Sequence, residues 1–243
     1  MKPFLLLSTR ADDRAAAEEY AAFARYAGLP PERLVHLRME AEPLPPLDLD
    51  HYAGAFIGGS PFNSSDPIEL KSAVQRRVES ELSVLLDEIV DRDFPFLGAC
   101  YGVGTLGVHQ GAVIDSTFAE EIGAVPITLS AAGRADPLLA GIPTTFDALV
   151  GHKEACRSLP DHVTLLASSP TCPVQMFRVK QNLYATQFHP ELDIPGITLR
   201  IKTYRHAGYF PPDEADQVIA RVRDAQVGVP PRILANFARR YGG

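Results

Sequence analysis

The chain has 243 residues, of which 46% are apolar and 22% charged, and its net charge is −7 at pH 7. A chain of this length buries a substantial core without metals or disulfides, and we expect one domain over residues 1–243. The negative charge, with no cluster of Lys and Arg, argues against nucleic acid or an anionic membrane as the main partner, because phosphate groups require a basic footprint. No stretch approaches the ~20 apolar residues of a membrane span.

Three cysteines are present, and no two of them form a CxxC pair. An odd, scattered set of this kind favours neither a disulfide framework nor a zinc site. The apolar run near the N-terminus is too short for a signal peptide, and charged residues follow it closely. We therefore expect a cytoplasmic protein whose thiols stay reduced.

Apolar runs alternate with helical patterns through the first half of the chain. The predicted strands cover residues 4–7, 34–37, 53–57 and 94–99, and the predicted helices cover 11–27, 67–90 and 101–109. The helix over 67–90 has the clearest pattern, because its apolar residues recur at helical spacing with charges between them. Strands that alternate with helices indicate an α/β protein whose parallel sheet is covered on both faces.

The second half of the chain consists of shorter strand-like runs joined by turns. The predicted strands cover residues 124–129, 146–150, 163–167, 174–179 and 183–187, and two helices follow over 212–225 and 231–241. We expect some of these strands to be antiparallel additions to the same sheet. The predicted fold is therefore an α/β open sheet, mainly parallel, with added antiparallel strands.

Cys100 lies in the turn Gly98-Ala99-Cys100-Tyr101-Gly102, between a predicted strand and a predicted helix. This G-x-C-x-G pattern in this context is typical of a nucleophile elbow, because glycines at the flanking positions avoid clashes on a sharp turn. The N–H groups at the start of the helix would lower the pKa of the thiol. The alternative is a cysteine that only fills space, which is how we interpret Cys156 and Cys172.

A thiol nucleophile needs a base and a group that orients the base, and His189 and Glu191 are the best candidates. They stand in Gln187-Phe188-His189-Pro190-Glu191, at the end of a predicted strand. A metal site formed by His189, Glu191 and Asp193 is the alternative, but the spacing is not a familiar one and no further Cys or His is near. We expect no metal and no cofactor, since this chemistry needs neither.

Together, GACYG and QFHPE resemble the class I (triad-type) glutamine amidotransferases, especially the amidotransferase domain of GMP synthase. The resemblance implies a three-layer α/β/α, flavodoxin-like fold and hydrolysis of the glutamine side-chain amide through a γ-glutamyl thioester, with release of ammonia. It assigns Cys100 as the nucleophile, His189 as the general base and Glu191 as its orienting partner. A small-molecule substrate follows, and the possible acceptor of the ammonia is a synthetase subunit.

Two further segments fit the same family. FIGGSP resembles its oxyanion loop, which implies that the backbone N–H groups of Gly59 and Tyr101 bind the developing oxyanion. VGHKE resembles its substrate-contacting segment. The substrate contacts expected from the resemblance are Gly58, Gly104, Gly151, His152 and Lys153.

Two departures from the family pattern leave the substrate open. The family usually shows C-x-G-x-Q after the nucleophile, and here Gly104 takes the place of the glutamine. The sequence also contains no signature of an ATP-using synthetase domain. The alternatives to glutamine hydrolysis are hydrolysis of another γ-glutamyl amide or peptide, and a non-catalytic regulatory module of the same fold.

Overall fold

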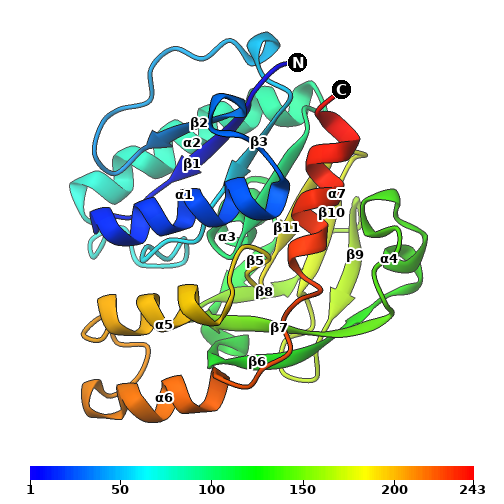
Figure 1. The fold of residues 1–243 in the computed structure, drawn as a ribbon. Coiled ribbons are helices and arrows are strands. Elements are labelled where there is room, and N and C mark those ends of the chain that lie inside the picture. Colours follow the sequence, from blue (N-terminus) through cyan, green and yellow to red (C-terminus); the bar gives the residue numbers. More distant parts are fainter.

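A nine-stranded sheet runs through the centre of the protein in the order β2-β1-β3-β4-β11-β10-β9-β6-β7 (Figure 1). The structure is a computed structural model and describes residues 1–243. In chain order the strands of this sheet are β1 (Phe4–Ser8), β2 (Leu34–Arg38), β3 (Gly54–Ile57), β4 (Phe96–Ala99), β6 (Glu120–Leu129), β7 (Thr145–His152), β9 (Val163–Ser168), β10 (Met176–Val179) and β11 (Leu183–Thr186). A second sheet pairs β5 (Val113–Asp115) with β8 (Ala155–Ser158).

The sheet changes direction at β11. From β2 through β1, β3 and β4 to β11 all neighbours are parallel. From β11 through β10, β9 and β6 to β7 all neighbours are antiparallel. The expected parallel sheet with antiparallel additions is therefore confirmed, and so is the flavodoxin-like α/β fold.

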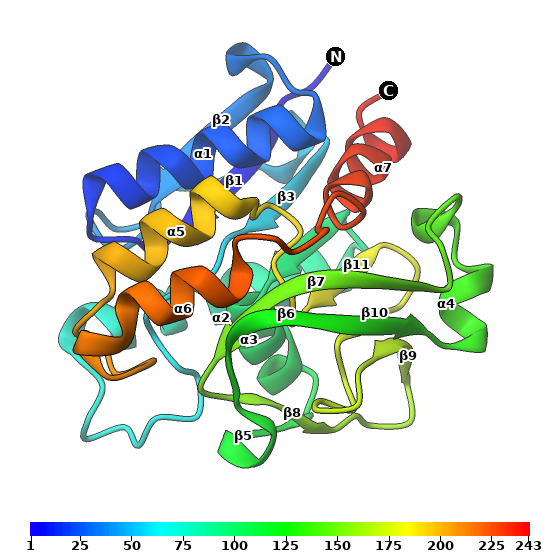
Figure 2. The same cartoon turned by 60° about the horizontal axis from the view of Figure 1, so that its bottom comes forward.

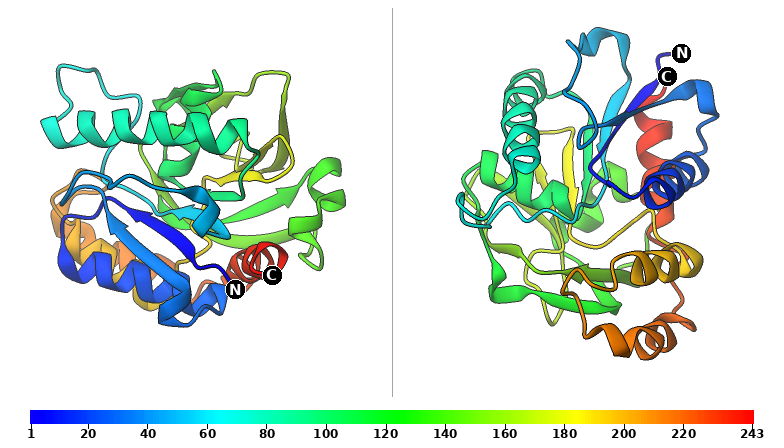
Figure 3. Two further views of the ribbon diagram at one scale, coloured as in Figure 1. Left: turned by 90° about the horizontal axis from the view of Figure 1, so that it is seen from above. Right: turned by 90° about the vertical axis from the view of Figure 1, so that its left-hand side faces the viewer.

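Helices cover both faces of the sheet (Figure 3). The seven helices are α1 (Asp13–Ala27), α2 (Ala73–Asp91), α3 (Tyr101–His109), α4 (Ala131–Ala135), α5 (Ile194–Thr203), α6 (Ala215–Val222) and α7 (Pro231–Tyr241). Phe23 of α1 and Phe237 of α7 pack in one buried cluster, whereas Val78 of α2 and Leu106 of α3 pack in another. The helices thus form two outer layers with the sheet between them.

Strand β1 shows why both layers form. Its residues alternate between the faces of the sheet, so Phe4 and Leu6 enter the cluster with α1 and α7. Leu5 and Leu7 enter the cluster with α2 and α3. All four side chains are fully buried, as expected of a parallel strand covered on both sides.

Helix α5 is the main element that the sequence analysis missed. It lies beside α1 and against α6, and the two helices bury a smaller apolar cluster against β6 and β7 (Figure 2). The long helix expected over 67–90 begins only at Ala73, because Ser72 caps it by accepting from the N–H of Gln75. No helix is both long and apolar enough to cross a membrane.

Candidate active site

Four neighbouring parallel strands deliver the candidate residues to one edge of the sheet. Arg10 follows β1, Gly59 follows β3, Cys100 follows β4 and His189 follows β11. These strands are adjacent in the order β1-β3-β4-β11. In open α/β sheets, ligands bind beyond the carboxyl ends of the strands, so the fold places the four residues where a ligand site is expected.

Cys100 has a backbone conformation that side chains rarely adopt, with φ 53° and ψ −81°. The turn that holds it is tight, since a Cβ atom on Gly98 would lie 2.6 Å from the α-carbon of Gly102. The flanking glycines are thus required by a close approach of backbone to backbone. Strained backbone of this kind concentrates at functional sites, and here it presents the thiol at the start of α3.

The resting thiol is not activated in the way the sequence suggested. Burial raises the pKa of the Cys100 thiol to about 12, although the Arg10 guanidinium acts in the opposite direction. Gln187 places its amide Nε2 3.9 Å from the sulfur, where it can donate to a developing thiolate. The thiol is therefore neutral at rest and needs a base at the moment of attack.

His189 is placed to be that base. Its Nδ1 atom lies 2.8 Å from Oε1 of Glu191, so the carboxylate holds the ring with Nε2 free for proton transfer. Burial lowers the pKa of His189, while the Glu191 carboxylate opposes that shift. Burial would raise the pKa of Glu191, but the charge of a protonated His189, the hydrogen bond with His189 and the Arg200 guanidinium together lower it to about 2. The result is a neutral imidazole beside an ionised carboxylate.

A buried charge network extends from Glu191 and was not predicted. Arg200 of α5 donates to Glu191 at 3.1 Å and to Glu19 of α1 at 3.2 Å. Glu19 also accepts from Arg10 at 2.7 Å and from the hydroxyl of Ser8 at 2.9 Å. The side chains of Glu19 and Glu191 are fully buried. Arg200 thus fixes the Glu191 carboxylate that orients His189, and Glu19 in turn links Arg200 to Arg10.

Of the two predicted oxyanion residues, Gly59 lies against His189 and Arg10, and Tyr101 lines the smaller cavity beside Cys100. A Cβ atom on Gly59 would lie 2.7 Å from Cε1 of His189 and 2.8 Å from Nη2 of Arg10, so only glycine fits there. Tyr101 is the first residue of α3, and its N–H has no partner within the helix. Gly58 instead faces the Glu19 carboxylate, 2.5 Å from where its Cβ would be, and lines neither cavity beside Cys100.

Ser64 and Glu154 fill the space beside position 104, where the family usually has a glutamine side chain. A Cβ atom on Gly104 would lie 2.5 Å from Oγ of Ser64 and 2.7 Å from Oε1 of Glu154. Glu154 accepts from the N–H groups of Ser64 and Ser65 at 2.8 and 2.7 Å, so its carboxylate fastens that loop beside α3. Glycine at position 104 is thus a packing requirement of the Glu154 carboxylate.

The remaining predicted contacts have separate surroundings. His152 is buried, with its ring nitrogens 2.9 Å from the carbonyl of Glu154 and 2.8 Å from Glu120. Lys153 donates to the carbonyl of Ala207 and lies 4.6 Å from the centre of the Tyr209 ring. Both line a cavity beside Cys100 together with Gly104, whereas Gly151 lines a second one.

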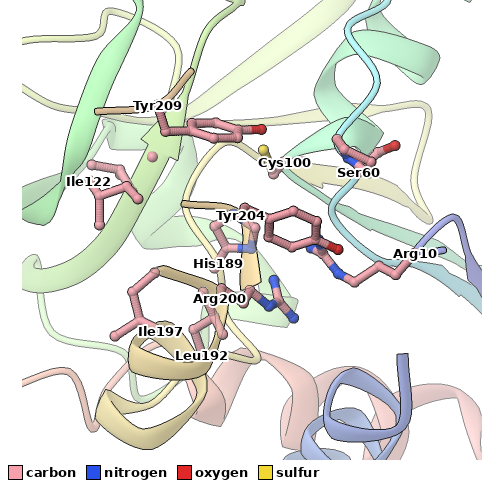
Figure 4. A pocket seen from close by; sticks show the side chains of 13 residues that line it. Arg10, Ser60, Cys100, Ile122, His189, Leu192, Ile197, Arg200, Tyr204 and Tyr209 are labelled. Carbon is pink, nitrogen blue, oxygen red and sulfur yellow. The ribbon is translucent and has the colours of Figure 1, made fainter. Parts of the chain in front are cut away.

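Two cavities meet at Cys100. The smaller, of about 10 Å³, is lined by Gly104, His152, Lys153 and Glu154 among others. The larger, of about 50 Å³, is lined by His189 and by Arg10, Arg200, Tyr204 and Tyr209 (Figure 4). Tyr209 and Ser60 line both. The sequence analysis predicted Cys100, Tyr101, Gly104, His152 and Lys153 in the lining of the smaller cavity, and Cys100, Gly151 and His189 in that of the larger.

No group of three or more His, Cys, Asp or Glu side chains is arranged to hold a metal ion. Cys156 and Cys172 are buried and unpaired, and each thiol contacts a backbone carbonyl, of Ser158 and Val174 respectively. The fold and site define a flavodoxin-like α/β protein with Cys100, His189 and Glu191 gathered at the carboxyl ends of two adjacent parallel strands.

Comparison with known proteins gives the family. The family model for glutamine amidotransferase class-I matches residues 34–195. The glutamine-hydrolyzing GMP synthase subunit of Thermoplasma acidophilum is 29% identical over 147 residues, 60% of this chain and 66% of that protein. Its counterpart in Thermoplasma volcanium is 34% identical over 114 residues, 46% of this chain and 55% of that protein. This chain belongs to the class I glutamine amidotransferase family.

The fold agrees with solved structures. A glutamine amidotransferase from Thermotoga maritima superposes with a TM-score of 0.76 at 19% identity, and the match covers 99% of each chain. The sequence matches are shorter than this structural match. In them, this chain spans about two thirds or less of the length of the GMP synthase subunits. Arg10 and Glu19, like Arg200, Tyr204 and Tyr209, lie outside residues 34–195.

Proposed function

We propose that the protein hydrolyses γ-glutamyl amides, with glutamine as the parent substrate, through a thioester on Cys100. The observation that carries the proposal is the strained Cys100 turn beside a His189 ring that Glu191 holds at 2.8 Å. A thiol on a strand-to-helix elbow and an oriented neutral imidazole are the two parts that acyl transfer requires.

In the first half of the reaction, His189 takes the Cys100 proton and the sulfur attacks the side-chain carbonyl carbon of the glutamyl group. The N–H groups of Gly59 and Tyr101 are the donors available to the oxyanion. When the tetrahedral species collapses, the C–N bond breaks and His189 gives its proton to the leaving nitrogen. In the second half, water adds to the thioester, the C–S bond breaks, and glutamate leaves with Cys100 again protonated.

Arg200 and Glu191 support this cycle through His189. Glu191 stabilises the imidazolium that forms when His189 accepts a proton, and Arg200 keeps Glu191 ionised. Because both groups are buried, their interaction with His189 is stronger than it would be in water.

A synthetase subunit that consumes the released ammonia is part of this proposal for the case in which glutamine is the substrate. It is supported by the similarity to the GMP synthase subunits of the two Thermoplasma species. A cytoplasmic location remains a prediction.

The test is release of glutamate from L-glutamine and from other γ-glutamyl amides by the protein and by its Cys100→Ala variant. We expect hydrolysis that Cys100→Ala reduces to background. Cys156→Ala is the matched control, because it removes a thiol that is buried away from both cavities. Absence of hydrolysis of every γ-glutamyl amide, together with an unreactive Cys100, would replace this proposal with a non-catalytic module.

A further inference from the structure

The larger cavity beside Cys100 has more room than ammonia needs. Its volume is about 50 Å³. A single water requires roughly 10–15 Å³ by the same kind of measure, and ammonia is of similar size. The space next to the thiol can therefore receive a leaving group of several heavy atoms.

The geometry of His189 identifies the larger cavity as the side of the leaving group. The leaving nitrogen must receive its proton from His189, because Nδ1 is engaged by Glu191 and only Nε2 is free. His189 lines the larger cavity and does not line the smaller one. A substrate with its scissile bond at Cys100 would place its leaving group there and its glutamyl part towards Gly104 and Glu154, where the smaller cavity of about 10 Å³ must widen to admit it.

The walls of the larger cavity combine an apolar surface with the guanidinium groups of Arg10 and Arg200. Ile122, Leu192 and Ile197 supply aliphatic side chains (Figure 4). Arg10 is 4% exposed, and its Nε and Nη1 atoms donate to Glu19 and to the hydroxyl of Tyr204. Its remaining nitrogen, Nη2, makes no hydrogen bond within the protein. A buried charged donor of this kind calls for an acceptor, and a carboxylate is the acceptor that a guanidinium binds best.

Arg10 and His189 lie close together, because both pack against the backbone of Gly59. Nη2 of Arg10 and Cε1 of His189 lie 2.8 and 2.7 Å from the same point, where a Cβ atom on Gly59 would be. The guanidinium of Arg10 and the imidazole of His189 therefore lie on the same side of the loop at Gly59. An α-amino acid carries its amine and its carboxylate on a single carbon, so one such leaving group can face both.

We propose that this cavity is a leaving-group site for a small apolar α-amino acid, which makes γ-glutamyl dipeptides the preferred substrates. The proposal rests on the thioester chemistry of Cys100 proposed above. The bond between the glutamyl carbonyl carbon and the amino-acid nitrogen breaks as the C–S bond forms, and His189 protonates that nitrogen. Water then hydrolyses the thioester, so one water is consumed and the products are glutamate and the free amino acid.

The test compares kcat/KM for γ-glutamyl-alanine, γ-glutamyl-ethylamide and glutamine. Ethylamine is alanine without its carboxylate, so the first two substrates differ only in the group that Arg10 would bind. We expect γ-glutamyl-alanine to exceed γ-glutamyl-ethylamide at least about tenfold, the scale of a charge-assisted hydrogen bond. Arg10→Met should abolish that preference, and Arg14→Met, on the exposed face of α1, should keep it.

A second variant serves if Arg10→Met fails to fold because Glu19 loses a partner. Ile197→Phe fills the cavity without removing a charge, and it should lower the ratio of kcat/KM for γ-glutamyl-alanine to that for glutamine at least about tenfold.

Wild-type protein that hydrolyses glutamine or γ-glutamyl-ethylamide through Cys100 as fast as γ-glutamyl-alanine would overturn the leaving-group site and leave the proposed function standing. Failure to hydrolyse any of the three would count against the proposed function itself. The two failures are thus distinguishable in a single set of assays.

Discussion

The two cavities that meet at Cys100 differ in where their residues come from. The smaller is lined by residues from the segments 60–63, 100–104 and 152–155 and by Ile114, Gln187 and Tyr209, almost all within the matched family range 34–195. The larger takes Arg10 from before that range, and Ile197, Arg200, Tyr204 and Tyr209 from after it. One cavity therefore belongs to the part of the chain that the family model describes, and the other is completed by α5 and by the segments around it.

The difference separates two tasks. The family segment carries the cysteine turn, the His–Glu pair and the loop at Gly59, which are the groups that would form and break the proposed thioester. The added segments contribute no reacting atom to that mechanism, but they close the side of the site that His189 faces. The two proposals thus assign bond cleavage and choice of leaving group to different parts of the chain, and variants should affect them separately.

His189→Ala should give the largest loss of kcat/KM. It removes both the base that activates a thiol whose pKa burial raises to about 12 and the acid that protonates the leaving nitrogen. We expect kcat/KM to fall about 10³-fold for every γ-glutamyl substrate, whatever its leaving group. Steady-state assays with glutamine and γ-glutamyl-alanine check this. A loss confined to one substrate would break the proposed division between the cavities.

Arg200→Met should have the largest effect on stability. It leaves Glu19 and Glu191 buried with one partner fewer each, and breaking a buried pair typically costs about 3–5 kcal/mol. The measurement is urea unfolding. Arg221→Met is the matched control, because Arg221 pairs with an exposed Glu121 and should change the free energy of unfolding by less than about 1 kcal/mol. Equal effects for the two variants would mean that the network contributes little.

The candidate catalytic residues could be proposed from the sequence because each stands in a short contiguous motif after a strand. Cys100 has its glycines beside it, and Glu191 is two residues from His189. Arg10 and Glu19 come into contact only because α1 folds back over the end of β1, and no local sequence pattern predicts that contact. The position of Arg10 just beyond a parallel strand was the one available signal.

Helix α5 was missed for a related reason. Its sequence IPGITLRIKT contains proline, glycine and β-branched residues, which have low helix propensity. Asp193 accepts from the N–H of Gly196 and Pro195 occupies the first turn, and both are helix-start signals that could have been used. Packing of Ile197 and Ile201 in the cluster with α6 then stabilises the helix and aims Arg200 at Glu191.

Glu191→Gln tests the proposed role of Glu191 through the pH dependence of kcat/KM. In the native protein burial lowers the pKa of His189, so the acidic limb of kcat/KM should lie below pH 6.5. The Glu191 carboxylate raises that pKa, and its loss should therefore move the limb to lower pH while the plateau falls about 10²-fold. A pH profile between 4 and 8 measures both. A limb that moves to higher pH would show that Glu191 does not stabilise the imidazolium.

Gly104→Ala tests the smaller cavity and should have the mildest effect. The new methyl group would clash with Ser64 and Glu154, because both distances are shorter than a van der Waals contact. The Glu154 carboxylate must therefore shift away from the N–H groups of Ser64 and Ser65. We expect kcat/KM to fall about tenfold for glutamine and for γ-glutamyl-alanine alike, because both place the same glutamyl group there. Gly123→Ala is the control, since its nearest neighbour would be 3.8 Å away. A fall for γ-glutamyl-alanine alone would place the leaving group, and not the glutamyl group, beside Gly104 and would exchange the roles assigned to the two cavities.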